Sequence, residues 1–245
     1  MIGEGNHPDL LELVDVSKVI GDRKILNRIS FRFRRGKRYY LAGANGSGKT
    51  TLFKVIASRM RATRGQVRYE GRNIADLDGQ YLRKVAFLSH ELNMYEELSG
   101  LDNLEFFGQV YRVPRPWERA MELIERVGLR LFANERVKYY SRGMRQRLAV
   151  AKALLHDPTV LLFDEPFAGL DLRGVAMLEE IIDEMLPKGQ GLFILATHDP
   201  GIAWRLTDHY LYLERGTLQS YGGQERYVHQ DIERKLREAR DVGVY

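Results

Sequence analysis

The residues best suited to chemistry form one glycine-rich segment, Gly43-Ala44-Asn45-Gly46-Ser47-Gly48-Lys49-Thr50. It matches the pattern G-x-x-x-x-G-K-[ST], and we call it the phosphate loop. Its glycines let successive backbone N–H groups turn toward one anion, and a following helix would present its positive N-terminus to the same anion. Lys49 offers a charge to the β- and γ-phosphates, and the Thr50 hydroxyl suits Mg²⁺. The segment, with Thr51 behind it, predicts a nucleoside triphosphate site.

A second group of reactive side chains, Asp164 and Glu165, follows the apolar run Thr159–Phe163. The C-terminal ends of parallel strands are where open α/β sheets place ligands. At such an end Asp164 would hold Mg²⁺ through water, and Glu165 would orient or deprotonate a water that attacks the γ-phosphate. The Asp-Glu pair is a weak signal alone, but together with the phosphate loop it predicts nucleotide hydrolysis.

The elements that must position these residues are indicated by hydrophobic spacing. Leu11–Val16 and the alternating positions Ile29, Phe31 and Phe33 predict strands of an antiparallel part. Helical spacing at Lys49–Ser58 follows the phosphate loop. Short apolar runs recur between helical stretches at Tyr39–Ala42, Val85–Leu88, Thr159–Phe163, Leu192–Ala196 and Tyr210–Leu213. This alternation predicts an α/β fold with a mostly parallel core sheet and an antiparallel β subdomain.

Helical spacing replaces the strand pattern between Glu91 and Tyr140. The apolar positions that mark it are Leu101, Leu104, Phe107, Met121, Ile124 and Val127. Pro116 suits the first turn of a helix, because its missing N–H has no partner there anyway. We therefore predict a helical subdomain inserted at about 91–140.

Composition favours a globular protein of the cytoplasm. No apolar stretch approaches the ~20 residues of a bilayer span, and the N-terminus lacks the pattern of a signal peptide. The formal net charge of +5 favours anionic partners, and the lack of cysteine excludes disulfides and thiolate metal sites. The charged tail, 222–245, is expected to contain a helix with Ile232 and Leu236 on one side. Both a solvated helix and a partner-binding role are open for this tail.

The segment Tyr140-Ser141-Arg142-Gly143-Met144 resembles the signature of ABC (ATP-binding cassette) ATPases, whose usual form is Leu-Ser-Gly-Gly-Gln. Ser141 is a natural N-cap for the helix that follows. The resemblance implies a P-loop NTPase of ABC type that forms a head-to-tail dimer with a second ATPase subunit. In that dimer Ser141 and Gly143 of one copy cover the ATP held by the phosphate loop of the other. ATP and Mg²⁺ are the implied cofactors, and transmembrane permease subunits are the implied partners.

Two further segments resemble elements of the same family. Ala168-Gly169-Leu170-Asp171 resembles the D-loop, and His198 resembles the switch histidine that contacts the γ-phosphate. The resemblance adds Asp171 to the nucleotide site and gives His198 a catalytic role with Glu165 and Lys49. It covers roughly Leu11 to Tyr221, so we expect one ATPase domain at 8–221. Its core would comprise 8–90 and 141–221, with the helical subdomain at about 91–140.

Three positions depart from the family pattern. Ile20 stands where an aromatic residue usually stacks on adenine, so it offers apolar contact without a stacking face. His90 stands at the position of the Q-loop glutamine, which reaches Mg²⁺, and Glu91 competes for that role. Arg142 replaces a signature glycine and either adds charge at the phosphate or faces solvent. A histidine at the Q-loop position, here His90, resembles the pattern of the haem-exporter ATPases of cytochrome c maturation. The signature segment resembles that of exporter ATPases more widely.

The implied function is a transport ATPase, peripheral on the inner face of the cell membrane, with cargo contacts in other polypeptides. The alternative is an ABC-type ATPase of DNA repair or chromosome maintenance. The sequence shows neither the sustained heptads nor the cysteines of such relatives, so no nucleic-acid partner is expected. A nucleotide-binding scaffold and a small-molecule kinase share the phosphate loop as well. Glu165 and His198 argue against the scaffold, while the signature and Asp171 would serve no purpose in a kinase.

Overall fold

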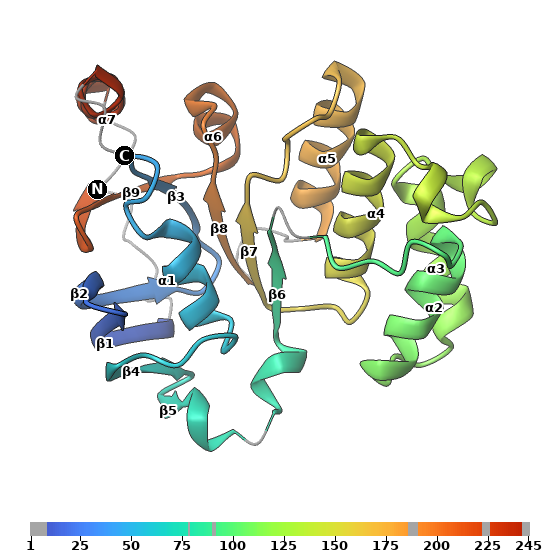
Figure 1. Cartoon of the computed structure of the whole chain (residues 1–245), viewed down its shortest axis with the longest axis horizontal. Helices are drawn as coiled ribbons and strands as arrows, with labels where there is room; N and C mark the ends of the chain where they lie inside the picture. Colours follow the sequence, from blue (N-terminus) through green and yellow to red (C-terminus); the bar gives the residue numbers. More distant parts are fainter. Residues whose placement is uncertain (1–8, 78, 90–91, 186–190, 222–225, 242–245) are drawn as a thin grey trace, which may run out of the picture. The chain divides into compact units, whose positions relative to one another are not determined.

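The computed structural model describes residues 9–77, 79–89, 92–185, 191–221 and 226–241 (Figure 1). The chain divides into two compact units, the first formed by Met1–Leu82 with Leu186–Tyr245 and the second by Arg83–Met185. Each unit is described by itself. No helix among the described residues has the length and apolar character to cross a membrane.

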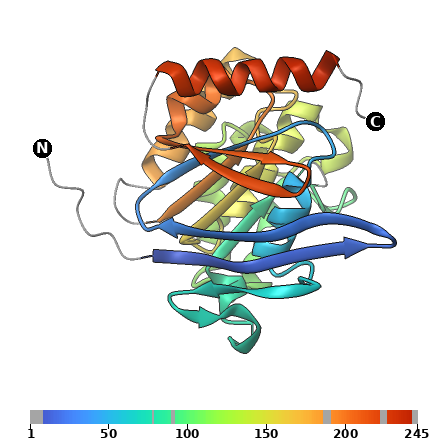
Figure 2. The same cartoon turned by 90° about the vertical axis from the view of Figure 1, so that its left-hand side faces the viewer.

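The first unit contains an antiparallel sheet with the strand order β2-β1-β4-β5. Its strands are β1 (Asp9–Ile20), β2 (Arg23–Arg34), β4 (Arg64–Tyr69) and β5 (Arg72–Asn73). Leu11, Leu13, Ile29 and Phe33 are buried, which confirms the predicted antiparallel part. The long β1–β2 hairpin lies across the view in Figure 2. β1 is longer than predicted because its pairing is interrupted by bulges near Asp15 (φ 49°) and then resumes.

A second sheet in this unit has the strand order β10-β9-β3-β8. Its strands are β3 (Arg38–Ala42), β8 (Leu192–Ala196), β9 (His209–Glu214) and β10 (Thr217–Tyr221). β3 pairs in parallel with both β8 and β9, as the continuous apolar runs predict, while β10 returns antiparallel at the edge. The helices of the unit are α1 (Lys49–Ile56), α6 (Pro200–Leu206) and α7 (Arg226–Asp241), with short 3-10 turns at Ile74–Asp76 and Tyr81–Arg83.

The second unit joins a parallel strand pair to the predicted helical insert. The strands are β6 (Val85–Leu88) and β7 (Val160–Asp164), which pair in register from end to end. The helices are α2 (Gly100–Val110), α3 (Pro116–Arg126), α4 (Arg142–Leu154) and α5 (Leu172–Met185), with 3-10 turns at Arg130–Phe132 and Val137–Tyr139. Pro116 occupies the first turn of α3, which confirms its predicted place. α2 and α3 pack against each other through buried apolar positions that include Leu104, Leu123 and Ile124.

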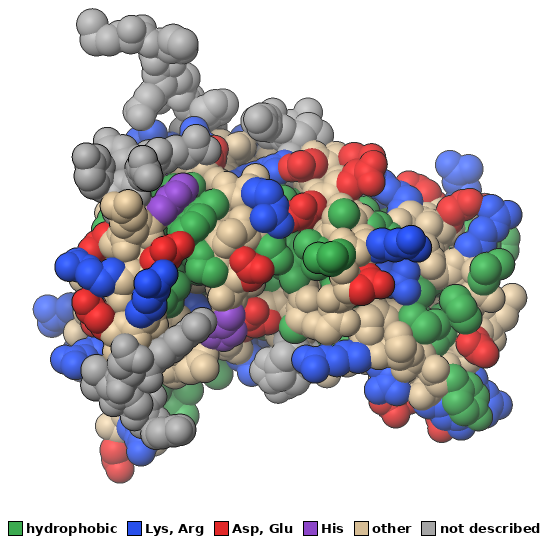
Figure 3. Space-filling view, turned by 90° about the horizontal axis from the view of Figure 1, so that it is seen from above, with side chains coloured by type: hydrophobic (Ala, Val, Ile, Leu, Met, Phe, Trp, Pro, Cys, Tyr) green, Lys and Arg blue, Asp and Glu red, His purple; other side chains and the backbone are tan. Residues whose placement is uncertain are grey.

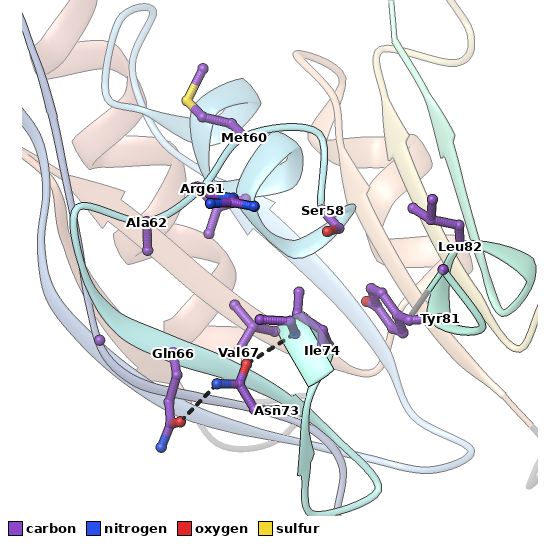
Figure 4. Close-up of a pocket in the computed structure, with 14 residues that line it drawn as sticks. Ser58, Met60, Arg61, Ala62, Gln66, Val67, Asn73, Ile74, Tyr81 and Leu82 are labelled. Atoms are coloured by element: carbon purple, nitrogen blue, oxygen red, sulfur yellow. Dashed lines mark hydrogen bonds between the residues drawn. The ribbon is translucent and has the colours of Figure 1, made fainter. Parts of the chain in front are cut away.

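A cavity of about 420 Å³ lies in the first unit behind α1, and Figure 4 shows its lining. Val55 and Ser58 line it from the C-terminal end of α1, and Val67 lines it from β4. Asn73 fixes the β5 side, since its amide donates to Gln66 Oε1 at 3.2 Å and its carbonyl oxygen accepts from the Ala75 amide. The phosphate loop precedes the other end of α1, so this cavity is separate from the predicted nucleotide site.

Gly65 shows how tightly β1 and β4 pack. It has a φ of +78°, and a Cβ at this position would lie only 2.3 Å from the Asp15 carbonyl oxygen at the β1 bulge. Gly71 has nearly the same φ, +77°, but a Cβ there would meet nothing within 4 Å.

We predict that Gly71→Ala costs about 1–2 kcal/mol of unfolding free energy, the cost of the left-handed backbone alone. Gly65→Ala should cost substantially more because β1 must move. Urea unfolding of both variants would measure the difference, and equal losses would contradict the packing described here.

Candidate functional site

The phosphate loop lies between β3 and α1, as predicted. Gly43, Gly46 and Gly48 adopt φ values of +154°, +76° and +108°, which L side chains rarely reach. Gly48 is the N-cap of α1, and no side chain caps that helix end. This geometry turns backbone N–H groups and the positive end of α1 toward one point. It is an arrangement that binds phosphate.

The loop is confined by neighbouring backbone. A Cβ on Gly43 would lie 2.5 Å from the Leu213 carbonyl oxygen at the end of β9. A Cβ on Gly48 would lie 3.1 Å from the Ile25 carbonyl oxygen on β2. Only glycine fits the first position, so the backbone of two strands confines the loop from outside.

Lys49 is buried beneath the loop, with 9% of its surface exposed. Its Nζ donates to the carbonyl oxygens of Gly43 and Ala44 at 2.7 and 2.9 Å. The ammonium group therefore lies inside the curve of the loop, where it can exchange these carbonyl contacts for phosphate oxygens. Thr50 and Thr51 follow on the first turn of α1 and are partly exposed, while Asn45 and Gly46 form the exposed apex of the loop.

Ile20 lies at the tip of the β1–β2 hairpin and is 47% exposed. It pairs with Arg23 across the turn, two residues before the Ile25 carbonyl that meets Gly48. The predicted base contact therefore belongs to the hairpin that also confines the phosphate loop. An exposed isoleucine can cover a base only by apolar contact.

His198 is exposed on the turn between β8 and α6. The turn is fixed on both sides of it. The Tyr40 hydroxyl donates to the Thr197 carbonyl oxygen at 3.1 Å, and Thr197 Oγ1 accepts from the Asp199 amide at 3.2 Å. Asp199 then caps α6 by accepting from the Ile202 amide. The imidazole is thus presented from a constrained backbone, as a catalytic side chain requires.

In the second unit, β7 ends at the two predicted carboxylates. All five strand residues are buried, and Asp164 is 6% exposed. Glu165 has a φ of 55°, an uncommon conformation for a residue with a side chain and one that recurs at active sites. The strand ends at Asp164, and the left-handed backbone of Glu165 follows it directly.

The signature segment, Tyr140–Met144, begins α4 in the same unit. Ser141 is the N-cap, because its Oγ accepts from the Met144 amide at 3.2 Å, which confirms that prediction. Burial raises the pKa of the preceding Tyr140 to about 12, so its hydroxyl stays protonated and donates to the Phe132 carbonyl oxygen at 2.7 Å. A Cβ on Gly100 would lie 2.2 Å from the same hydroxyl. The exposed Ser141 is therefore anchored from behind by Tyr140.

The signature segment and the D-loop lie against each other. A Cβ on Gly143 would come within 3.2 Å of the Gly169 carbonyl oxygen, and one on Gly169 would meet the Arg142 side chain at 2.8 Å. Arg142 is exposed, and its side chain lies over Gly169. Asp171 Oδ1 accepts from the Gly174 amide at 2.8 Å at the start of α5. Asp171 is therefore fixed at the exposed end of the D-loop.

Sequence reasoning missed Gln146. It is 6% exposed on α4, and its amide donates to the Pro166 carbonyl oxygen at 2.8 Å, one residue after Glu165. It thereby ties the signature helix to the loop that follows the carboxylates. A polar residue on the buried side of a helical pattern was the available signal.

Two predicted positions fall outside the described residues. These are His90 and Glu91, the alternatives for the Q-loop side chain. Within the described part of the chain, no group of three or more histidine or acidic side chains could hold a metal ion. Mg²⁺ usually binds to nucleotide enzymes through one or two carboxylates plus substrate phosphates, so it needs no preformed cage of protein ligands.

Comparison with known proteins agrees with this geometry. Residues 26–168 match the family model described as ABC transporter, more than half of the chain and including both the phosphate loop and the signature segment. The chain is 30% identical to the ABC transporter ATP-binding protein NatA of Bacillus subtilis, over 89% of this chain and 93% of NatA. It is 32% identical to the lantibiotic transport ATP-binding protein SrtF of Streptococcus pyogenes, over 88% and 93% of the two chains.

Solved structures of ATP-binding cassettes share the fold of this chain. The structure of an ATP-binding subunit of an ABC transporter has a TM-score of 0.82, with 28% identity over 95% of this chain and 98% of that one. A dimeric ATP-binding cassette in a post-hydrolysis state with ADP and Pi has a TM-score of 0.78, with 26% identity over 88% and 100%. The fold is therefore that of an ATP-binding cassette. This chain belongs to the ABC transporter family and is an ATP-binding and ATP-hydrolysing subunit of such a transporter.

Gln146 provides a test of the unit that carries the carboxylates. We predict that Gln146→Ala costs about 1–3 kcal/mol of unfolding free energy, because the buried Pro166 carbonyl loses its donor. It should also lower ATP turnover, since the loop after Glu165 is released. The matched control is Gln109→Ala on the exposed side of α2, which should change stability by less than about 0.5 kcal/mol. Thermal unfolding and phosphate-release assays of both variants would measure these effects. Equal losses of stability and turnover in the two variants would show that the Gln146 contact does not hold the loop after Glu165.

Proposed function

We propose that two copies of this subunit sandwich two ATP molecules head to tail and drive separate membrane subunits by closing and reopening. The observation that carries this proposal is the phosphate loop, with three left-handed glycines leading into an uncapped helix. Gly43–Thr51 would bind the triphosphate, with Lys49 facing its β- and γ-phosphates. Ile20 would make apolar contact with the base.

The hydrolytic roles follow from side-chain chemistry. Glu165 would orient and deprotonate the attacking water, and His198 would contact the γ-phosphate and support that water. Thr50 and Asp164 would hold Mg²⁺, with His90 or Glu91 as a further candidate ligand. The chemistry that Mg²⁺ supplies when bound is neutralisation of charge on the β- and γ-phosphates.

The second copy would complete each site. Ser141 caps α4 and Gly143 lies in its first turn, and the positive N-terminus of this helix would serve as a further site for an anion. In the proposed dimer they cover the γ-phosphate bound by the other copy, and Asp171 passes information between the two sites. The dimeric cassette among the related structures supports this arrangement. Arg142 would leave Gly169 and add positive charge at that phosphate when the dimer closes.

We propose membrane partners because the chain belongs to the ABC transporter family. A transporter needs a path through the bilayer, and no described helix supplies one. Transmembrane permease subunits would therefore bind this chain, and we place it on the cytoplasmic face of the cell membrane. Figure 3 shows lysine and arginine side chains interspersed with acidic ones on the face it presents, rather than a continuous basic patch of the kind that binds nucleic acid.

Glu165 gives the direct test of the hydrolytic site. We predict that Glu165→Gln lowers steady-state ATP turnover by about 100-fold or more, because a general base contributes 10²–10⁴-fold. ATP should still bind, so the variant should accumulate as an ATP-dependent dimer in sizing chromatography. Undiminished turnover would remove Glu165 from the role of base.

Lys49 gives the test of the binding site. Lys49→Ala should abolish the ATP-dependent shift to dimer, because the β- and γ-phosphates lose their cation. Lys54→Ala, on the same helix but outside the phosphate loop, is the matched control and should dimerise normally. ATP-dependent dimers of Lys49→Ala that equal those of the control would refute the proposed site.

A further inference from the structure

The C-terminal helix α7 packs on the strands behind the phosphate loop, and this packing gives the tail a role. β9 pairs with β3, the strand that leads into the loop, so that Tyr212 lies opposite Ala42. The next residue on each strand makes the closest approach, between Gly43 and the Leu213 carbonyl oxygen. The end of β9 is therefore the surface on which the loop rests.

The β9–β10 hairpin needs support, because β10 is the edge of its sheet among the described strands. Figure 2 shows α7 along the top of the view, above this hairpin. Ile232 on α7 is fully buried, and Val228 is 9% exposed. The helix is therefore docked rather than solvated on all sides, although most of its residues are charged.

Lys235 makes the central polar contacts between α7 and the hairpin. Its Nζ donates to the Tyr221 hydroxyl at 2.6 Å and to Gln219 Oε1 at 2.8 Å, both on β10. It also lies 5.0 Å from the centre of the Tyr212 ring on β9, within the range of a cation–π contact. Burial alone would lower the pKa of Lys235, but the hydrogen bond to Tyr221 and the charge of Asp231 raise it overall. One ammonium group thus joins both strands of the hairpin to the helix.

The first half of α7 is joined to α6 by stacked rings. The rings of Trp204 on α6 and His229 on α7 lie 4.3 Å apart with an interplanar angle of 7°. Tyr210 of β9 meets the same histidine edge-on at 5.0 Å. Burial lowers the pKa of His229, which favours the neutral ring in this stack. α6 begins two residues after His198, so α7 contacts the supports of both the loop and the predicted switch histidine.

The space between α7 and the phosphate loop is not filled by side chains. A cavity of about 300 Å³ lies there, lined by Ala44–Ser47, by Tyr212–Arg215 of β9 and its turn, and by Lys235 and Glu238 of α7. The outer side of the loop therefore lacks direct packing from α7. The contacts that α7 makes on this side are with the β9–β10 hairpin, which lies beneath the loop.

We propose that α7 is a buttress of the nucleotide site and that Lys235 is its positioning residue, which holds the β9–β10 hairpin against the phosphate loop. This rests on the proposed function, in which the loop binds ATP. Releasing the hairpin lets the Leu213 carbonyl withdraw from Gly43, so the loop no longer presents its N–H groups at fixed positions. ATP binding weakens more than the chemical step, because Glu165 and the Gln146 contact lie in the other unit and stay in place.

The test substitutes Lys235 and a neighbouring cation on the same helix. Lys235→Met removes the charge and keeps the length of the side chain. Arg237→Met is the matched control, since the Arg237 side chain is 79% exposed and forms an ion pair with Glu233 on the same helix at 3.6 Å. We expect Lys235→Met to raise the KM for ATP about tenfold, with kcat falling less than about threefold, the scale of one or two hydrogen bonds to a charged group. Arg237→Met should leave both constants unchanged, and Lys235→Arg should restore the KM to within about twofold.

Tyr221→Phe keeps the proposal testable if Lys235→Met fails to fold. It removes only the hydroxyl that joins Lys235 to Asp231, and it should raise the KM about two- to threefold. A KM equal to that of Arg237→Met in both variants, with folding confirmed by circular dichroism, would overturn the buttress. If the proposed function itself is wrong, the result is a different one, because Lys49→Ala would then bind ATP as well as the unmodified protein does. If Lys49→Ala loses binding while the Lys235 and Tyr221 variants keep it, only the buttress is wrong.

Discussion

The phosphate loop is held by backbone on backbone contact, and the rest of the nucleotide site depends on that constraint. The Leu213 carbonyl of β9 meets Gly43, and the Ile25 carbonyl of β2 meets Gly48. The same Ile25 carbonyl meets Gly216 at the β9–β10 turn, where the Gly216 carbonyl accepts from the Asn27 amide at 2.8 Å. Three segments far apart in sequence therefore converge on one junction. A Cβ at Gly43 or Gly216 would lie only 2.5 Å from a carbonyl oxygen, and one at Gly48 would be tight at 3.1 Å, so these contacts restrict the shape of the loop.

This junction explains why an antiparallel sheet accompanies the parallel one. β2 supplies the contact at Gly48, and its hairpin partner β1 carries Ile20 at the exposed tip. β9 supplies the contact at Gly43 and is paired directly to β3. The proposed contacts to base and to phosphate therefore both depend on strands that confine the loop. In the second unit, Glu165 follows the end of β7 and Ser141 precedes the start of α4. Gln146 on α4 donates to the Pro166 carbonyl just after Glu165, and the D-loop packs against the signature segment at Gly143.

Most elements could be predicted because their signals are local. The segment Leu11–Val16 predicts β1, and alternation at Ile29, Phe31 and Phe33 predicts β2. Apolar runs predict β3 and β6 to β9, and Ser141 predicts the start of α4. The role of Lys235 could not be predicted, because its partners on the β9–β10 hairpin are brought to it by folding and its charge resembles any other in a charged tail. Arg142 was equally open, since only the structure shows it lying over Gly169. Ile232 indicates an apolar side of α7, but the sequence does not indicate which surface that side packs against.

Sharing of each ATP between two copies is the central claim, and the natural lack of cysteine allows a direct measurement. Asn45→Cys and Arg142→Cys would be made in separate copies that also carry Glu165→Gln, then mixed and oxidised with and without ATP. The account predicts a disulfide-linked dimer only in the mixture and only with ATP. A mixture without that dimer, while a chain carrying both cysteines links to itself as a monomer, would contradict it.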